Sequence, residues 1–186
     1  MPDARRPRRD ARDNEAKLRA AALEIFEDKG LDASLESIAK AAGVSIGTLY
    51  NRFGSREGLI DAVIPDIAGA RLQTLGAEVL AQPDPKARLE TFVRGMIALQ
   101  RQDPALNDAI LRRYPDATAL IGICDASTAL GQDLIAQAHD AGVLAPEFTQ
   151  ADLFHLLWLA GIASREAHAP NGWQHTLTRA LDNAWT

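Results

Sequence analysis

The sequence predicts an all-α protein of about nine helices. Apolar residues recur three and four positions apart along nearly the whole chain, and no stretch keeps the alternation of a half-buried strand. Glycine and proline interrupt this periodicity at intervals that suit helices of ordinary length. With 186 residues, 47% hydrophobic and 24% charged, the chain has the composition and length of an ordinary globular protein.

Four helices are expected in the first third of the chain. The first runs from about Asn14 to Lys29, with an apolar stripe on one side and Gly30 as its left-handed cap. Each of the next three begins after a serine, a residue type whose side chain satisfies the free N–H groups of a first helical turn. These N-caps are Ser34, Ser45 and Ser55.

Proline and glycine divide the rest of the chain. Pro65 is expected to end or kink the fourth helix near Val63 and Ile64, because proline removes a backbone donor and collides with the preceding turn. The chain can then resume as a helix to about Leu80. The remaining boundaries are expected at 82–85, Asp103–Pro104, Tyr114–Pro115, Gly142, the capping box Thr149–Asp152 and 170–172.

Charge is distributed unevenly along the chain. The formal net charge is −5, yet residues 1–56 hold 11 Lys and Arg against 9 Asp and Glu, so the acidic excess belongs to the remainder. A slightly basic N-terminal segment followed by an acidic remainder is typical of a DNA-binding module attached to a domain that does not touch DNA. Five arginines crowd the first thirteen positions, which form either a solvated tail or a DNA-contacting arm. They are Arg5, Arg6, Arg8, Arg9 and Arg12.

Several classes of protein are disfavoured. A single cysteine excludes an intrachain disulfide and a thiolate zinc site. No segment has the pattern of a signal peptide or a membrane span, so a cytoplasmic protein without a membrane partner is expected. The four histidines lack metal-ligand spacing, and neither a phosphate-binding glycine loop nor a nucleophile elbow occurs. The sequence therefore predicts no catalytic residue, metal or cofactor.

Two short helices joined by a tight turn over 42–45 have the features of a helix-turn-helix. Gly43 can adopt the positive φ of such a turn, while Val44, Leu49 and Phe53 can pack the second helix onto the first. A recognition helix presents its N-terminal residues to base edges in the major groove, while hydroxyls and helix N-termini bind phosphates. Glycine at 47 lowers helix propensity by about 1 kcal/mol relative to alanine, which suits a close approach of the backbone to DNA. The outer surface and its edges comprise Ser45, Ile46, Gly47, Thr48, Tyr50, Asn51 and Arg52.

The segment Leu31–Phe53 resembles the N-terminal domain of the TetR/AcrR family of transcriptional regulators. Its most specific part is the series Ile-Ala, Ala-Gly-Val-Ser, Gly-Thr-Leu-Tyr and Phe over 38–53. The resemblance covers about residues 14–63, a third of the chain. The residues that it implies on the DNA backbone are Ser34, Thr48, Tyr50 and Arg56. Those that it implies against bases are Ile46, Gly47, Tyr50 and Asn51.

Three positions depart from the residues usual in that family. Arg56 stands where a lysine usually opens the fourth helix, a change that keeps the phosphate-binding charge. Arg52 stands where histidine or tyrosine is common, so the resemblance does not assign it to a base or to a phosphate. Ser34 replaces the commoner threonine.

The resemblance also implies a homodimer that binds palindromic operator DNA. In this family the C-terminal helices form both the dimer interface and a cavity for a small-molecule effector, and effector binding usually releases the DNA. Three parts of the chain are expected on this basis. They are a flexible basic arm over 1–13, a helix-turn-helix DNA-binding domain over 14–60, and a helical effector-binding and dimerisation domain over 61–186.

Two sets of C-terminal residues are candidates for these roles. The pocket set combines apolar and aromatic side chains with a few polar ones, although each of them taken singly can equally belong to the core. These candidates are Phe92, Met96, Gln100, Tyr114, Cys124, His155 and Trp158. The last two helices offer more apolar surface than a thin domain covers, which favours a dimer interface. Those candidates are Leu153, Leu156, Leu157, Ala160, Gly161, Ser164, Trp173, Leu177 and Leu181.

The sequence thus favours a DNA-binding transcriptional regulator, in its simplest form a ligand-released repressor. The alternative is a helix-turn-helix activator or a nucleoid-associated scaffold without small-molecule control, and an enzyme is the third class. Sequence-blind, salt-dependent binding would favour the scaffold, whereas tight binding to one palindrome would favour the repressor.

Overall fold

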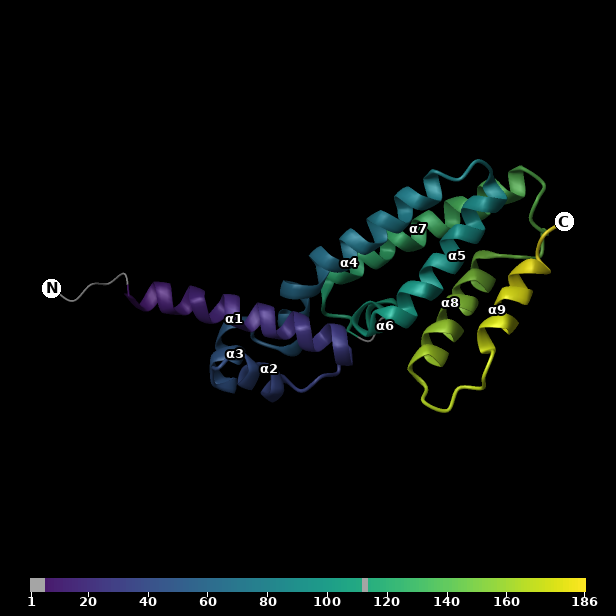
Figure 1. Cartoon of the computed structure of the whole chain (residues 1–186). Helices are drawn as coiled ribbons and strands as arrows, with labels where there is room; N and C mark the ends of the chain where they lie inside the picture. The colour runs from purple at the N-terminus through teal and green to yellow at the C-terminus, as the bar shows by residue number, and fades with distance from the viewer. Residues whose placement is uncertain (1–5, 112–113) are drawn as a thin grey trace.

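The computed structural model describes residues 6–111 and 114–186, and this part of the chain contains nine α-helices and no strand (Figure 1). The all-α prediction is confirmed. One isolated antiparallel bridge pairs Leu144 with Trp185 near the C-terminus. The helices are α1 (Arg6–Lys29), α2 (Leu35–Ala41), α3 (Ile46–Phe53), α4 (Arg56–Leu80), α5 (Pro85–Gln102), α6 (Pro104–Ile110), α7 (Thr118–Asp140), α8 (Gln150–Arg165) and α9 (Trp173–Asp182).

The first helix begins earlier than the sequence predicted. α1 starts at Arg6 rather than at Asn14, so the flexible arm expected over 1–13 is helical from residue 6 on, while residues 1–5 lie outside the described residues. The added segment contains no glycine, and Pro7 stands in the first turn, where its missing N–H has no helical partner to lose. Alanine and arginine are strong helix formers, so the helix extends backwards.

α4 does not end at Pro65. It continues without interruption through the proline, although proline inside a helix costs about 3 kcal/mol. Val63 and Ile64, just before the proline, are buried, so the turn is held by its packing. Arg19 of α1 also donates a hydrogen bond to the carbonyl oxygen of Ala62 in the same turn. Tertiary contacts therefore outweigh the local helix-breaking signal.

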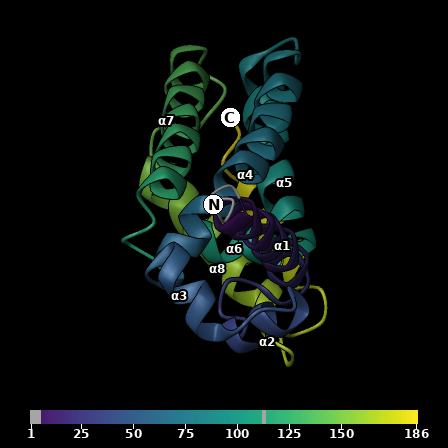
Figure 2. The ribbon, with the colours of Figure 1, turned by 90° about the vertical axis from the view of Figure 1, so that its left-hand side faces the viewer.

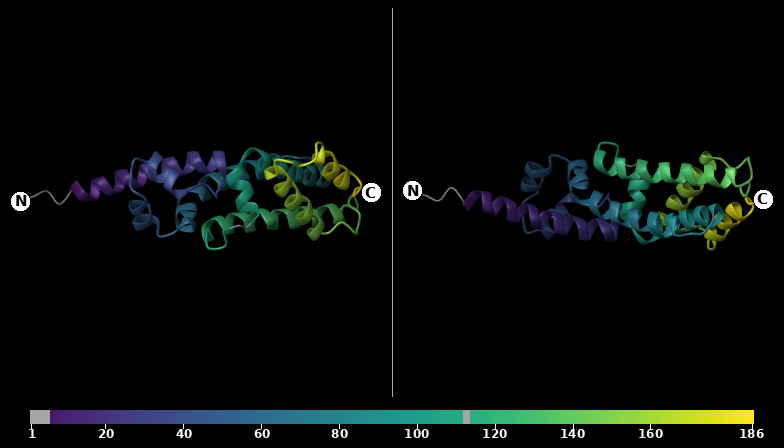
Figure 3. Two further views of the ribbon diagram at one scale, coloured as in Figure 1. Left: turned by 90° about the horizontal axis from the view of Figure 1, so that it is seen from below. Right: turned by 90° about the horizontal axis from the view of Figure 1, so that it is seen from above.

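The molecule is elongated, with α1, α2 and α3 near one end and the C-terminus at the other (Figure 3). Its buried apolar residues form two clusters. The first joins α1–α4 to α6 and the start of α7 and includes Phe26, Leu49 and Leu106. The second joins the C-terminal half of α4 to α5, α7, α8 and α9 and includes Leu89 and Leu134. Both α4 and the first cluster thus cross the domain boundary expected at residue 60.

α7 is long and apolar enough, by length and composition alone, to cross a membrane, which the sequence analysis did not expect. An 18-residue window within it has a mean hydropathy of 1.2, and 28% of that window is buried. A core helix of a soluble protein meets the same criterion. In this fold α7 packs against α4, α5, α6 and α8 (Figure 2).

Candidate nucleic-acid interface and ligand cavity

Three serines cap the helices of the N-terminal unit, as predicted. Each Oγ accepts a hydrogen bond from the backbone N–H three residues later, at 3.3 Å for Ser34, 3.1 Å for Ser45 and 3.0 Å for Ser55. The Ser34 hydroxyl also donates to the carboxylate of Glu36 at 2.8 Å. A backbone hydrogen bond and this hydroxyl together hold the pKa of Glu36 below its ordinary value. Ser34 therefore has to give up an ionised partner before it can donate to a phosphate.

The turn between α2 and α3 has the predicted geometry. Gly43 has a φ of 69°, a conformation that residues with a side chain rarely adopt. The next N–H, that of Val44, donates to the carbonyl oxygen of Ala39 at 3.0 Å and closes the turn. The angle between the two helices is thus set by the backbone at a position that favours glycine.

α3 buries one face and exposes the other. Leu49 is fully buried in the first cluster, and the half-buried Ile46 packs against that cluster. Thr48 is partly exposed, and its hydroxyl lies 2.9 Å from the hydroxyl of Ser45. The outer face offers an aromatic hydroxyl, an amide and a guanidinium, all suited to contacts in a DNA groove. The exposed residues of this face are Gly47, Tyr50, Asn51 and Arg52.

Gly47 is not required by the packing of the protein. A Cβ added at this position would have one neighbour within 4 Å, the Oγ of Ser45 at 3.7 Å, which is an ordinary contact. At Gly58, in the first turn of α4, an added Cβ would lie 2.1 Å from the carbonyl oxygen of Phe53. The fold therefore needs glycine at 58 but accepts a side chain at 47. A reason for glycine at 47 has to come from a partner that approaches the backbone.

Arg56, expected to hold a phosphate, contacts the protein itself in this structure. Its Nη1 donates to the carbonyl oxygens of Leu31 and Ala33, each at 2.7 Å. The side chain is partly buried and fixes the loop that precedes α2. In this structure Arg56 orders the N-terminal helical unit (α1–α3) from within.

Arg52 is engaged with α1. It forms an ion pair with Glu15, which Arg19 also contacts at 3.1 Å. Partial burial opposes ionisation of Glu15, but the hydrogen bonds from the two arginines outweigh it and hold the pKa of this carboxyl below its ordinary value. The guanidinium at the C-terminal end of α3 is therefore positioned by α1.

A buried carboxylate ties the end of α1 to two C-terminal helices. Asp108 of α6 is fully buried, and its Oδ2 accepts a hydrogen bond from the backbone N–H of Leu31 at 2.8 Å. Arg165, the last residue of α8, places Nη2 3.8 Å from this oxygen and donates to the carbonyl oxygen of Lys29 at 3.0 Å. A Cβ added at Gly30 would lie 2.5 Å from Asp108 Oδ2, so only glycine fits between these groups.

Three more polar contacts, two from Arg71 and one from Tyr114, join the same units. Arg71 of α4 bridges Glu27 of α1, at 2.6 Å, and Asp103 at the start of α6. The hydroxyl of Tyr114 donates to Asp32 at 2.5 Å. Burial and this hydrogen bond raise the pKa of Tyr114 well above its ordinary value. Tyr114, predicted to line the pocket, instead faces the DNA-binding unit.

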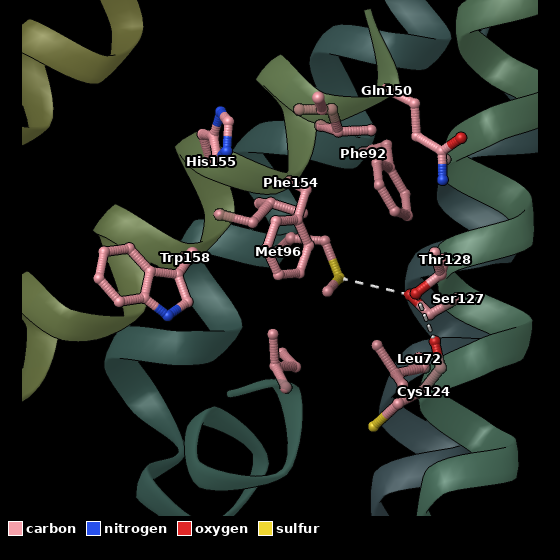
Figure 4. A pocket seen from close by; sticks show the side chains of 15 residues that line it. Leu72, Phe92, Met96, Cys124, Ser127, Thr128, Gln150, Phe154, His155 and Trp158 are labelled. Atoms are coloured by element: carbon pink, nitrogen blue, oxygen red, sulfur yellow. Dashed lines mark hydrogen bonds between the residues drawn. The ribbon is translucent and has the colours of Figure 1, made fainter. Parts of the chain in front are cut away.

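A cavity of about 380 Å³ lies among α4, α5, α6, α7 and α8 (Figure 4). In the figure, side chains from α7 and α8 face one another across it, with Met96 between them. Five of the seven predicted pocket residues line this cavity. They are Phe92, Met96, Cys124, His155 and Trp158.

Gln100, like Tyr114, was predicted to line the pocket but does not. It supports the wall of the cavity instead. It is buried, and its Nε2 donates to the carbonyl oxygen of Leu157 at 3.0 Å and to the side-chain oxygen of Asn107 at 3.3 Å. Gly161 makes this arrangement possible, because an added Cβ there would lie 2.7 Å from both amide side chains. The polar cluster therefore locks α5, α6 and α8 together.

The cavity is apolar with a few neutral polar groups. Its lining, as far as the structure describes it, contains no Asp, Glu, Lys or Arg. The Thr128 hydroxyl donates to the carbonyl oxygen of Cys124 at 2.9 Å, and the Ser127 hydroxyl lies 3.8 Å from the sulfur of Met96. No group of three or more His, Cys, Asp or Glu that could hold a metal ion occurs among the described residues. The lining suits an uncharged ligand with aromatic or aliphatic parts.

Sequence reasoning missed most of the α7 side of the cavity. Ser127, Thr128 and Gly131 line it together with Cys124, at offsets of three, four and seven. Residues at these offsets share one face of a helix. Helical periodicity counted from Cys124 would have found them.

The residues predicted for the dimer interface mostly face inward. Leu153 and Leu157 line the cavity, and Ser164 donates to the carbonyl oxygen of Ala160. Trp173 and Leu177 are half-buried. The members buried inside the chain are Leu153, Leu156, Ala160, Gly161 and Leu181. Because α8 is apolar all round, its sequence does not tell which face turns inward. The large apolar residues that α8 exposes are Phe154, Trp158, Leu159 and Ile162.

Two family models match the chain. That of bacterial regulatory proteins of the tetR family covers residues 18–63, and that of the SbtR-like transcriptional regulator C-terminal domain covers residues 84–182. The HTH-type transcriptional regulatory protein RaaS of Mycobacterium tuberculosis is 39% identical over 92 residues, which are 46% of this chain and 43% of RaaS. The chain spans less than half the length of the curated relative in this match.

Solved structures share the fold over most of the chain. A TetR transcriptional regulator from Streptomyces coelicolor is 28% identical, with a TM-score of 0.54 over 91% of this chain and 97% of that one. RolR, solved with resorcinol, has a TM-score of 0.61 over 93% of this chain and 87% of its own, at 17% identity.

Proposed function

The chain belongs to the TetR family of bacterial regulatory proteins, and from this premise we propose that it is a sequence-specific DNA-binding transcriptional regulator. In this proposal α3 reads the major groove of a palindromic operator, two copies of the chain bind together, and a small molecule in the cavity releases the DNA. Such a regulator acts in the cytoplasm and performs no catalysis.

The exposed face of α3 carries the proposal. Three observations about it support DNA reading: capped helix starts, an exposed tyrosine and asparagine, and a glycine at 47 that the protein itself does not require. Close approach to a base edge or a phosphate explains that glycine, because a Cβ would stand between the helix backbone and the DNA.

The exposed face of α8 supports a two-fold dimer. Phe154, Trp158, Leu159 and Ile162 are large apolar residues exposed on one helix, where Phe154 and Trp158 also line the cavity. Apolar side chains gathered on one exposed helix favour an interface. A dimer also places two recognition helices on successive major grooves, about 34–36 Å apart. Light scattering at twice the 20.1 kDa chain mass checks this part of the proposal.

The polar contacts around α6 support release by a ligand. Ile110 of α6 lines the cavity, while Asp108 of the same helix accepts a hydrogen bond from the backbone N–H of Leu31, just after α1. α8 likewise lines the cavity, and its last residue, Arg165, donates a hydrogen bond to the carbonyl oxygen of Lys29 at the end of α1. A ligand that displaces α6 or α8 would therefore move the end of α1 and with it the DNA-binding unit. RolR, with the same fold, was solved with resorcinol, an uncharged aromatic molecule of the class that the lining suits.

Selection from random double-stranded DNA, followed by a footprint, tests the proposal. We expect the wild-type chain to enrich a palindrome, and Tyr50→Ala to weaken its binding about tenfold or more through loss of a groove contact. Leu80→Ala is the matched control, because Leu80 is also a large exposed residue but lies at the far end of α4. Equal binding by both variants would contradict the assignment of α3. Salt-dependent binding without sequence preference would favour the scaffold alternative.

A further inference from the structure

A second hollow adjoins the effector cavity. It measures about 520 Å³ and lies between α4 and α7, with Gly69 and Gly76 on one side and Ala126 on the other. Leu72, Phe92 and Ser127 belong to the linings of both hollows. The two spaces therefore share a wall.

We propose that the two hollows form one channel, and that it takes an uncharged ligand with a polar head in the cavity and an alkyl tail in the α4–α7 groove. This inference rests on the proposed function, because the cavity is the effector site in both. It adds the shape and chemical class of the effector.

The shared wall is made of side chains that a ligand can displace. Ser127 contacts α5 across it through the Met96 sulfur at 3.8 Å, and a thioether is a weak acceptor. Phe92 and Leu72 are apolar and contribute no polar contact that a tail would have to replace. The channel requires the buried Phe92 ring and the half-buried Leu72 side chain to rotate when the tail enters.

The groove has the chemistry and length of an alkyl site. An added Cβ at Gly76 would lie 3.9 Å from Leu130, and one at Gly69 would lie 3.6 Å from Ile123, so each glycine leaves room for about one carbon atom in van der Waals contact with α7. From residue 69 to residue 80, α4 extends about 16 Å at about 1.5 Å per residue. Leu80, at the open end, is 63% exposed, so an apolar surface continues to the mouth of the groove.

Binding of 4-alkylphenols to the full chain tests the channel. The phenol head has a partner in His155 or Thr128, and Trp158 in the cavity wall reports binding by its fluorescence. We expect the affinity to rise about fourfold for each methylene from 4-ethylphenol to 4-nonylphenol, as expected when apolar surface leaves water. Equal affinities across the series would overturn the channel while leaving the cavity as an effector site.

A filled groove provides the decisive comparison. In Gly76→Leu we expect the ratio of 4-nonylphenol to 4-ethylphenol affinity to fall toward one, because the new side chain occupies the path of the tail. Gly122→Leu is the matched control on α7, since an added Cβ there meets no atom within 4 Å and Gly122 lines neither hollow. Equal ratios in the two variants, or a change of oligomeric mass in Gly76→Leu alone, would overturn the proposal. These ligand-binding experiments involve no DNA, so failure of the proposed operator binding cannot be mistaken for failure of the channel.

Discussion

The outer face of α3 and the cavity between the C-terminal helices are built in opposite ways. α3 consists of eight consecutive residues, and its N-cap Ser45 and the turn glycine Gly43 stand directly before it in the sequence. The cavity takes side chains from five helices, between Leu72 and Trp158, and none of these helices defines it alone. A surface made by one helix can be recognised from local spacing. A hollow made by five depends on how each helix is rotated in the bundle.

The two regions are nevertheless mechanically joined. α6 follows the DNA-binding unit by some forty residues in sequence, yet its buried face belongs to the first cluster, and Asp108 and Arg165 hold the chain at Leu31 and Lys29. The outer face of α3 is therefore encoded locally, while its unit is supported by helices from the C-terminal half. The three predictions below test this contrast.

The largest effect is expected where the two regions share a core. Leu106 of α6 is fully buried in the first cluster, so Leu106→Ala should lower the free energy of unfolding by about 2–5 kcal/mol. Leu134→Ala, fully buried in the second cluster, is the matched comparison. Urea denaturation measures both. If only Leu134→Ala were destabilising, α6 would not support the DNA-binding unit.

A second prediction separates function from stability at Gly47. Gly47→Ala should leave the fold intact and raise the free energy of unfolding by at most about 1 kcal/mol, because alanine favours a helix. The same variant should bind operator DNA about tenfold more weakly, because the Cβ keeps the backbone away from a groove contact. Gly122→Ala, at another unobstructed helical glycine, should change stability similarly and DNA affinity not at all. Thermal unfolding and a DNA-binding titration provide the two measurements, and unchanged affinity of Gly47→Ala would remove the argument for close approach.

The smallest effect concerns the contact between Tyr114 and Asp32. Tyr114→Phe should lower stability by about 1 kcal/mol at neutral pH through the lost hydrogen bond. Because the pKa of Tyr114 is raised in the folded state, the stability that the phenol contributes is present below the unfolded pKa of about 10 and is lost as pH rises above it. Urea denaturation from pH 7 to 11 should show this decline in the wild type and a weaker one in Tyr114→Phe. Parallel curves would show that the contact does not couple to folding.

Much of the N-terminal unit could be predicted because its signals are local. The serines at 34, 45 and 55 cap helices within three residues of themselves, and Gly43 needs only its own backbone to make the turn. The roles of single side chains were harder to predict from the sequence. The hydrogen bonds of Arg56 to two carbonyl groups more than twenty residues away were not expected, because only folding brings that loop near, and its contact with a phosphate stays a prediction.

The sequence by itself determined the fold class, the helix caps and the position of α3, because hydrogen bonds within one turn and helical periodicity decide these features. The tertiary structure decided that α4 passes through Pro65, that Gln100 and Tyr114 brace the helices rather than line the cavity, and which face of α8 stays open. For Gln100, Tyr114 and α8 several arrangements satisfy the local chemistry equally well, whereas at Pro65 the local preference opposes the observed helix. Packing against residues distant in sequence selects one, because burial and polar contacts between helices outweigh local preferences of a few kcal/mol.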